Sequence, residues 1–126
     1  MRPTNFTKNR VWKGKKRNES SLVTACLNWL QCQENLGNIA YVDRMNSGRI
    51  SGVRLHRAGC SDIIIILNDG RVVWCECKTE KGVIRDSQID FEKVIQEIPN
   101  HFYIVVRSLD ELVDKLKLRQ NCAGDL

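Results

Sequence analysis

The stretch GCSDIIIILNDGRVVWCECK, residues 59–78, decides the fold of this chain. Its two runs rich in β-branched residues, Asp62–Leu67 and Arg71–Lys78, flank Asn68-Asp69-Gly70, which is typical of a β-hairpin turn with glycine where φ must be positive. The first run is apolar throughout after its aspartate, as in a strand that is covered on both faces. We therefore expect this hairpin at the centre of a sheet.

Charged residues at the ends of the hairpin share one face of the predicted sheet. Glu76 and Lys78 are two residues apart and project from the same side of a strand. The loop length decides whether Asp62 joins them. A two-residue loop would set Asp62 opposite Cys77, whereas a three-residue Asn-Asp-Gly loop ending in a glycine bulge sets it opposite Glu76. We favour the three-residue loop.

In that register the Cβ atoms of Asp62 and Glu76 lie roughly 4.5–5.5 Å apart. Two carboxylates at this distance repel each other unless they share a proton or a cation. Magnesium takes hard oxygen ligands and commonly uses one or two carboxylates together with phosphate and water. The hairpin therefore predicts a divalent-metal site.

These residues resemble a known family. Gly59-Cys60-Ser61-Asp62, then Glu76-Cys77-Lys78 after thirteen residues, and then Ser87-Gln88 are similar to the PD-(D/E)XK nucleases, and most closely to their VRR-NUC group. The resemblance runs from about Glu19 to about Leu116. One departure is that Cys60-Ser61 stands where a proline often precedes the aspartate. The resemblance implies an α/β fold with a restriction-endonuclease-like core, a mixed β-sheet flanked by helices, in the order αβββαβ plus a C-terminal helix.

The resemblance also implies roles for the site residues. Asp62, Glu76 and the Cys77 backbone carbonyl would hold Mg²⁺ or Mn²⁺, and Glu19 would join them directly or through water. Lys78 would orient or deprotonate the attacking water, and Gln88 would hold Lys78 or that water. The predicted catalytic residues are therefore Asp62, Glu76, Lys78 and Gln88.

The pattern of the first predicted helix supports the inward position of Glu19. Asn18 is a plausible N-cap of a helix that runs to about Leu36, and Gly37 ends it. Glu19 stands at the head of an apolar stripe, so its carboxylate points inward. Alternatively, it is a first-turn glutamate that the helix dipole favours. The stripe consists of Leu22, Cys26, Trp29 and Leu30.

A second helix places Gln88 in the same way. Asp86 or Ser87 is the expected N-cap, and Gln88 heads a buried face formed by Phe91, Val94, Ile95 and Ile98. Alternatively, Gln88 caps a neighbouring loop. The strand that follows, His101–Val106, should lie parallel to Arg71–Lys78 because a helix crosses over between them.

The remaining elements follow from the same signals. Ile39–Met45 is the expected first strand, which we predict to pair as a hairpin with the basic segment Arg49–Arg57. Ser108 with Glu111 forms a capping box that opens a last helix. Residues 1–17 should form a basic flexible arm, 18–119 the nuclease-like domain and 120–126 a frayed C-terminus.

The formal net charge of +5 suits a polyanionic partner, because phosphate neutralisation with counterion release drives non-specific nucleic-acid binding. The alternative is a solvated basic surface. The candidate nucleic-acid contacts are Arg44, Asn46, Arg54, Arg57, Lys81, Lys15 and Lys16. The 126 residues contain no apolar run of membrane-span length and no secretory pattern, so we expect a cytoplasmic protein, in the host cytoplasm if a phage encodes it. The six cysteines lack zinc spacing and should be reduced packing groups.

The resemblance implies a structure-selective endodeoxyribonuclease, with compact phage-type members similar to Holliday-junction resolvases that act as homodimers. A two-fold dimer would match the two-fold symmetry of a four-way junction. Its apolar interface is predicted at Trp12 with Val23 and Leu27 on the outer side of the first helix. The alternatives are a flap or nicking nuclease, a non-catalytic nucleic-acid-binding module with the same fold, or a structural subunit whose basic faces bind a protein.

Overall fold

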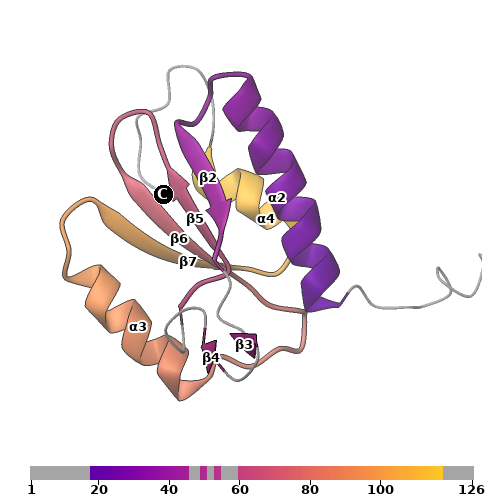
Figure 1. Ribbon diagram of the computed structural model, residues 1–126, viewed down its shortest axis with the longest axis vertical. Coiled ribbons are helices and arrows are strands. Elements are labelled where there is room, and N and C mark those ends of the chain that lie inside the picture. The colour runs from indigo at the N-terminus through magenta and orange to yellow at the C-terminus, as the bar shows by residue number, and fades with distance from the viewer. Residues whose placement is uncertain (1–17, 46–48, 51–52, 55–59, 118–126) are drawn as a thin grey trace, which may run out of the picture.

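A four-stranded mixed sheet forms the centre of the computed structural model, which describes residues 18–45, 49–50, 53–54 and 60–117 (Figure 1). The strand order is β2-β5-β6-β7, in which β6 pairs antiparallel with β5 and parallel with β7. The hairpin thus occupies both central positions, as its apolar sequence predicted. The strands are β2 (Tyr41–Arg44), β5 (Ile63–Ile66), β6 (Val72–Cys77) and β7 (His101–Val106).

Helices cover both faces of this sheet (Figure 1). α2 (Glu19–Asn35) and α4 (Leu109–Leu116) pack together on one face, over the main core, and α3 (Asp86–Gln96) lies on the other. The side chains of β6 alternate between the two layers: Val73 and Cys75 join the main core, whereas Trp74 packs with Phe91 of α3. The chain is therefore α/β with a mixed sheet, as expected.

The turn of the hairpin has the predicted three-residue loop. Ile66 pairs with Val72, the Leu67 N–H donates to the Arg71 carbonyl, and Gly70 has φ of 95°. A positive φ is strained for residues with a Cβ, which explains the glycine. The ladder runs to the Ile63–Cys75 pair, and the Asp62 N–H donates to the Cys75 carbonyl at 3.0 Å, so Asp62 lies beside the end of β6 that carries Glu76.

α2 begins and ends as the sequence predicts, but its buried face is rotated. The Asn18 side chain accepts from the Ser21 N–H at 2.7 Å, and Gly37 follows the helix with φ of 83°. Val23 is only 2% exposed and belongs to the core, against which Leu27 also packs. The predicted interface at Val23 and Leu27 is therefore wrong, because Val23 lies inside the main core and Leu27 packs against it; Trp12 lies outside the described residues.

α3 differs from its prediction at both its start and its face. Its N-cap is Arg85, and its buried residues are Gln88, Phe91 and Ile95. Val94 is 45% exposed and Ile98 39% exposed, so half of the predicted apolar face meets solvent. The reason is that α3 packs mainly on the edge strand β7, which covers a narrow stripe of the helix.

The first strand pairs differently from the prediction. β2 pairs antiparallel with β5, whereas the short strands β3 (Arg49–Ile50) and β4 (Val53–Arg54) pair with each other. The central hairpin supplies the free edge that β2 requires. α4 has the predicted cap, in which the Ser108 hydroxyl accepts from the Glu111 N–H at 3.1 Å.

The described cysteines form no disulfide. Four of them are buried, in agreement with the predicted role as packing groups, whereas Cys32 is exposed and does not fit it. Among the described helices, none is both long and apolar enough to cross a membrane.

Candidate active site

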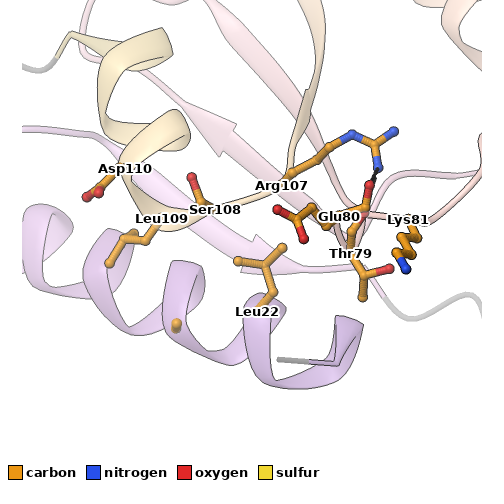
Figure 2. A pocket seen from close by; sticks show the side chains of 9 residues that line it. Leu22, Thr79, Glu80, Lys81, Arg107, Ser108, Leu109 and Asp110 are labelled. Atoms are coloured by element: carbon orange, nitrogen blue, oxygen red, sulfur yellow. Dashed lines mark hydrogen bonds between the residues drawn. The ribbon is translucent and has the colours of Figure 1, made fainter. Parts of the chain in front are cut away.

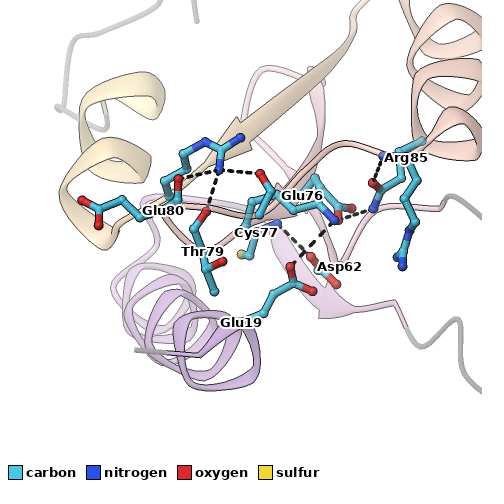
Figure 3. A network of polar contacts seen from close by, with 11 residues as sticks. Glu19, Asp62, Glu76, Cys77, Thr79, Glu80 and Arg85 are labelled. Carbon is cyan, nitrogen blue, oxygen red and sulfur yellow. Dashed lines mark hydrogen bonds and ion pairs between the residues drawn. The ribbon is translucent and has the colours of Figure 1, made fainter. Parts of the chain in front are cut away.

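Asp62 and Glu76 meet where β5 begins and β6 ends, on the α3 side of the sheet (Figure 3). One Asp62 oxygen, Oδ2, accepts a hydrogen bond from the Cys77 backbone N–H at 2.8 Å. The N–H and C=O of one strand residue point to the same side, so the Cys77 carbonyl also faces the Asp62 edge. The hairpin thus brings two carboxylates and a main-chain carbonyl to one place.

Glu76 is buried, with only 2% of its surface exposed. Its Oε2 accepts a short hydrogen bond of 2.6 Å from Gln88 Nε2, but its Oε1 is buried and has no hydrogen-bond partner within the part of the chain that the structure describes. Leaving such an acceptor unsatisfied costs about 1–3 kcal/mol, and more for a charged group. This oxygen is therefore a position where a cation or a donor would be stabilising.

The Lys78 ammonium lies between two carboxylates. Its Nζ is 3.6 Å from Glu76 Oε2 and 3.8 Å from Glu19 Oε2, and the residue is only 4% exposed. Glu19 reaches this place from the first turn of α2, which lies on the opposite face of the sheet (Figure 3). The structure thus brings together the four charged residues that the sequence singled out for the site.

Gln88 serves two contacts at once. Its Oε1 accepts from the Arg85 N–H at 2.9 Å, which closes the start of α3, while its Nε2 donates to Glu76. Gln88 therefore caps the start of α3 and also contacts the Glu76 carboxylate. The sequence suggested that it holds Lys78 or the attacking water, and its part in catalysis stays a prediction.

Burial shapes the electrostatics of the carboxylate pair. Loss of solvation, together with the negative charge of Asp62, raises the pKa of Glu76 to about 8, although Lys78 opposes the rise. The pKa of Asp62 is also raised, mainly by burial and then by the charge of Glu19, while its bond from Cys77 opposes the rise. Ionisation of both groups below about pH 8 is therefore unfavourable with Lys78 alone, and a further positive charge beside them would favour it.

The donor set fits a hard divalent cation. Within the described residues, no group of three or more His, Cys, Asp and Glu side chains is arranged to hold a metal. The predicted set is Asp62, Glu76 and the Cys77 carbonyl, with Glu19 bound directly or through water; in the structure Glu19 faces Lys78, and 43% of its side chain is exposed. Carboxylate and carbonyl oxygens suit Mg²⁺ or Mn²⁺, and Glu76 Oε1 has no hydrogen-bond partner among the described residues. The ligand assignment stays a prediction.

The candidate nucleic-acid contacts are only partly described. Arg44, at the end of β2, lies near enough to Asp62 for its positive charge to oppose the rise of the Asp62 pKa. Lys81 is exposed in the loop after Lys78. Arg54 lies in β4, for which the backbone alone is described. Asn46, Arg57, Lys15 and Lys16 lie outside the described residues.

Arg107 is a residue that sequence reasoning missed. Its Nη1 donates to the carbonyls of Thr79 at 2.6 Å and Gly82 at 3.0 Å, with a longer contact to Glu80. A Cβ on Gly82 would lie 3.3 Å from Lys78 Cδ, so this loop packs on the lysine side chain. Arg107 therefore holds the loop that covers Lys78. In the sequence, an arginine after a strand is typical of a solvated surface charge. Its partners here are main-chain carbonyls, which every residue has, so no residue type in the sequence indicates them.

Fold and site together give an α/β protein with a PD-(D/E)XK-like fold, in which adjacent strand ends carry an aspartate, a glutamate and a lysine. A solved structure named "VRR_NUC domain protein" superposes with a TM-score of 0.53 at 15% identity, covering 82% of this chain and 88% of that one. The chain therefore has the fold of a VRR-NUC domain. No protein-family model matches the sequence, and a search of curated proteins finds no match.

Proposed function

We propose that this protein is a divalent-metal-dependent, structure-selective endodeoxyribonuclease that hydrolyses DNA phosphodiester bonds. The observation that carries the proposal is the buried Glu76, which lies beside Asp62 and Lys78 and has one oxygen that no described residue bonds. A fold that only bound DNA would gain nothing from carboxylates at this position, because they repel phosphate. The fold likeness to a VRR-NUC domain adds support.

Each residue has a defined part in this proposal. Asp62, Glu76 and the Cys77 carbonyl would hold Mg²⁺ or Mn²⁺, with Glu19 as a direct or water-mediated partner. When bound, such an ion polarises phosphate and acidifies water. Lys78 donates hydrogen bonds to the attacking water or to the developing negative charge. Gln88 fixes the Glu76 carboxylate through its 2.6 Å hydrogen bond.

The proposed substrate is branched DNA, as for a Holliday-junction resolvase, and the proposed active species is a homodimer. Its support is the family resemblance and the symmetry of a junction, because a two-fold pair of sites matches two equivalent strands. The interface that the sequence suggested on α2 is not part of the proposal. A flap or nicking nuclease is the alternative within the class.

Cleavage assays with four-way junction, flap, duplex and single-stranded DNA, with Mg²⁺, Mn²⁺ or EDTA, test this function. We expect incision only with the divalent ion, fastest on the junction and in symmetric pairs. Glu76→Gln should abolish incision, and Glu97→Gln, at an exposed position after α3, is the matched control. DNA binding in EDTA, without incision in Mg²⁺ or Mn²⁺, would mean that the protein is a non-catalytic DNA-binding module.

Metal binding has its own readout. A ligand that binds only the folded state stabilises it, by about 2.7 kcal/mol at one hundred times its Kd. Mn²⁺ should therefore raise the melting temperature of the wild type and of Glu97→Gln, but not that of Glu76→Gln. Light scattering decides the oligomeric state, and a monomer that cuts junction and duplex equally would remove the resolvase part of the proposal.

A further inference from the structure

A cavity of about 430 Å³ opens beside the active-site lysine (Figure 2). It lies between α2, the start of α4 and the loop that Arg107 holds. Leu22 lies about one turn after Glu19 on α2, and Thr79 directly follows Lys78. The cavity and the carboxylate site therefore lie next to each other, on either side of the Lys78–Thr79 segment.

The lining combines an apolar floor with a polar rim. Leu22, Ala25 and Leu109 form the floor, and Figure 2 shows Leu22 and Leu109 projecting from the two helices. The rest of the lining, which we call the rim, is polar and consists of Thr79, Ser108, Lys81, Arg107, Glu80 and Asp110; Figure 2 shows the Arg107 and Asp110 end groups turned away from Leu22 and Leu109. The rim thus offers both donors and acceptors beside an apolar surface.

This chemistry does not suit a phosphate. The two carboxylates cancel the two cations, so the rim carries no net formal charge and its acidic side chains repel an anion. A nucleobase is neutral, presents donors and acceptors on its edge, and gains from apolar contact on its faces. The volume lies within the range of roughly 300–1,000 Å³ that is common for small-ligand sites.

We infer that this cavity receives one unpaired nucleobase of the DNA that is bound at the neighbouring carboxylate site. The inference rests on the proposed function, because it assumes DNA as the substrate. A base within a duplex is stacked and has its edge paired, so only a base at a junction, bulge or flap can enter without a large unstacking cost. The cavity would thereby recognise branched DNA next to the reacting phosphate.

The test compares binding of two DNAs without metal. One is a duplex that carries a single bulged 2-aminopurine, and the other is the same duplex with that base paired; affinity and 2-aminopurine fluorescence are measured in EDTA. Ala25→Phe adds a ring inside the cavity, and Thr24→Phe adds the same ring at the adjacent exposed position of α2. Ala25→Leu is a smaller filler, for use if the phenylalanine variant does not fold.

We expect the wild type and Thr24→Phe to bind the bulged duplex about tenfold more tightly than the paired one, the scale of one base contact. The fluorescence of the bulged 2-aminopurine should change when the bulged duplex binds to either of these two proteins. Ala25→Phe or Ala25→Leu should lose most of this preference and of the fluorescence change. Equal preference in the Ala25 and Thr24 variants, or none in the wild type, overturns the inference.

Cleavage assays in Mg²⁺ distinguish a failure of the cavity inference from a failure of the proposed nuclease function. If the wild type cuts DNA and the Ala25 variants differ from it in neither binding preference nor cleavage, the cavity inference is overturned and the proposed nuclease function stands. A cavity-dependent preference for the bulge in a protein that never cuts DNA supports the base site and overturns the proposed function.

Discussion

Glu76→Gln should stabilise the metal-free protein at pH 8 but not at pH 5. The Glu76 carboxyl has a pKa of about 8 in the folded protein, against an ordinary value of 4.5. Because its folded pKa is raised, the folded state holds this proton more tightly than the unfolded chain does. The stability that this gives is present below pH 4.5 and is lost as the pH rises towards 8.

The size of this effect follows from the two pKa values. One pKa unit corresponds to about 1.4 kcal/mol, so between pH 5 and pH 8 the wild type should lose about 3 kcal/mol of stability through Glu76. An amide in the same place cannot ionise. The difference in unfolding free energy between Glu76→Gln and the wild type should therefore shift by about 3 kcal/mol in favour of the variant.

Urea denaturation in EDTA at pH 5, 6, 7 and 8 measures this difference. Taking the difference between two proteins removes the titration of groups that they share. Glu97→Gln, an exposed carboxylate, should give a difference that does not change with pH. A pH-independent difference for Glu76→Gln would refute the claim that burial and Asp62 raise the pKa of this carboxyl.

Four further predictions concern single residues. Asp62→Ala should abolish metal-dependent cleavage while DNA binding in EDTA is kept or tightened, because a proposed ligand and a negative charge near phosphate are lost; substantial activity would reject its assignment. Gln88→Ala should slow cleavage roughly tenfold to a thousandfold, the scale of losing one orienting donor, whereas a lower melting temperature with unchanged rate would make it structural. Arg107→Ala should speed amide hydrogen exchange of residues 79–82 and slow cleavage, because the bonds that hold this loop are lost, and Arg107→Lys should recover part of both. Unchanged exchange would contradict the claim that Arg107 holds the loop. Gly70→Ala should cost about 1 kcal/mol or more of stability, measured by urea unfolding, because φ is 95° there; an unchanged midpoint would count against a strained turn.

Local signals were sufficient for most of the backbone. The spacing of Asn68-Asp69-Gly70 fixed the register of β5 on β6, and with it the proximity of Asp62 to Glu76, because a tight turn leaves few ways to align its strands. Asn18 and Ser108 marked helix starts through side-chain bonds that span only three residues. Each of these features depends on neighbours in the chain, so the sequence carries it directly.

Contacts between distant segments required the tertiary structure. Val23 and Val94 both belong to helices of the expected type, but the packing of α2 on the main core and of α3 on the edge strand β7 decided that the first is buried and the second exposed. The hydrogen bond of Gln88 to Glu76 and the hold of Arg107 on the loop after Lys78 join segments that are 12 to 28 residues apart. Periodicity determines which residues share a face of an element. The angle and position at which the elements pack determine what that face contacts, and here they decide how the carboxylates are held and where the cavity beside them opens.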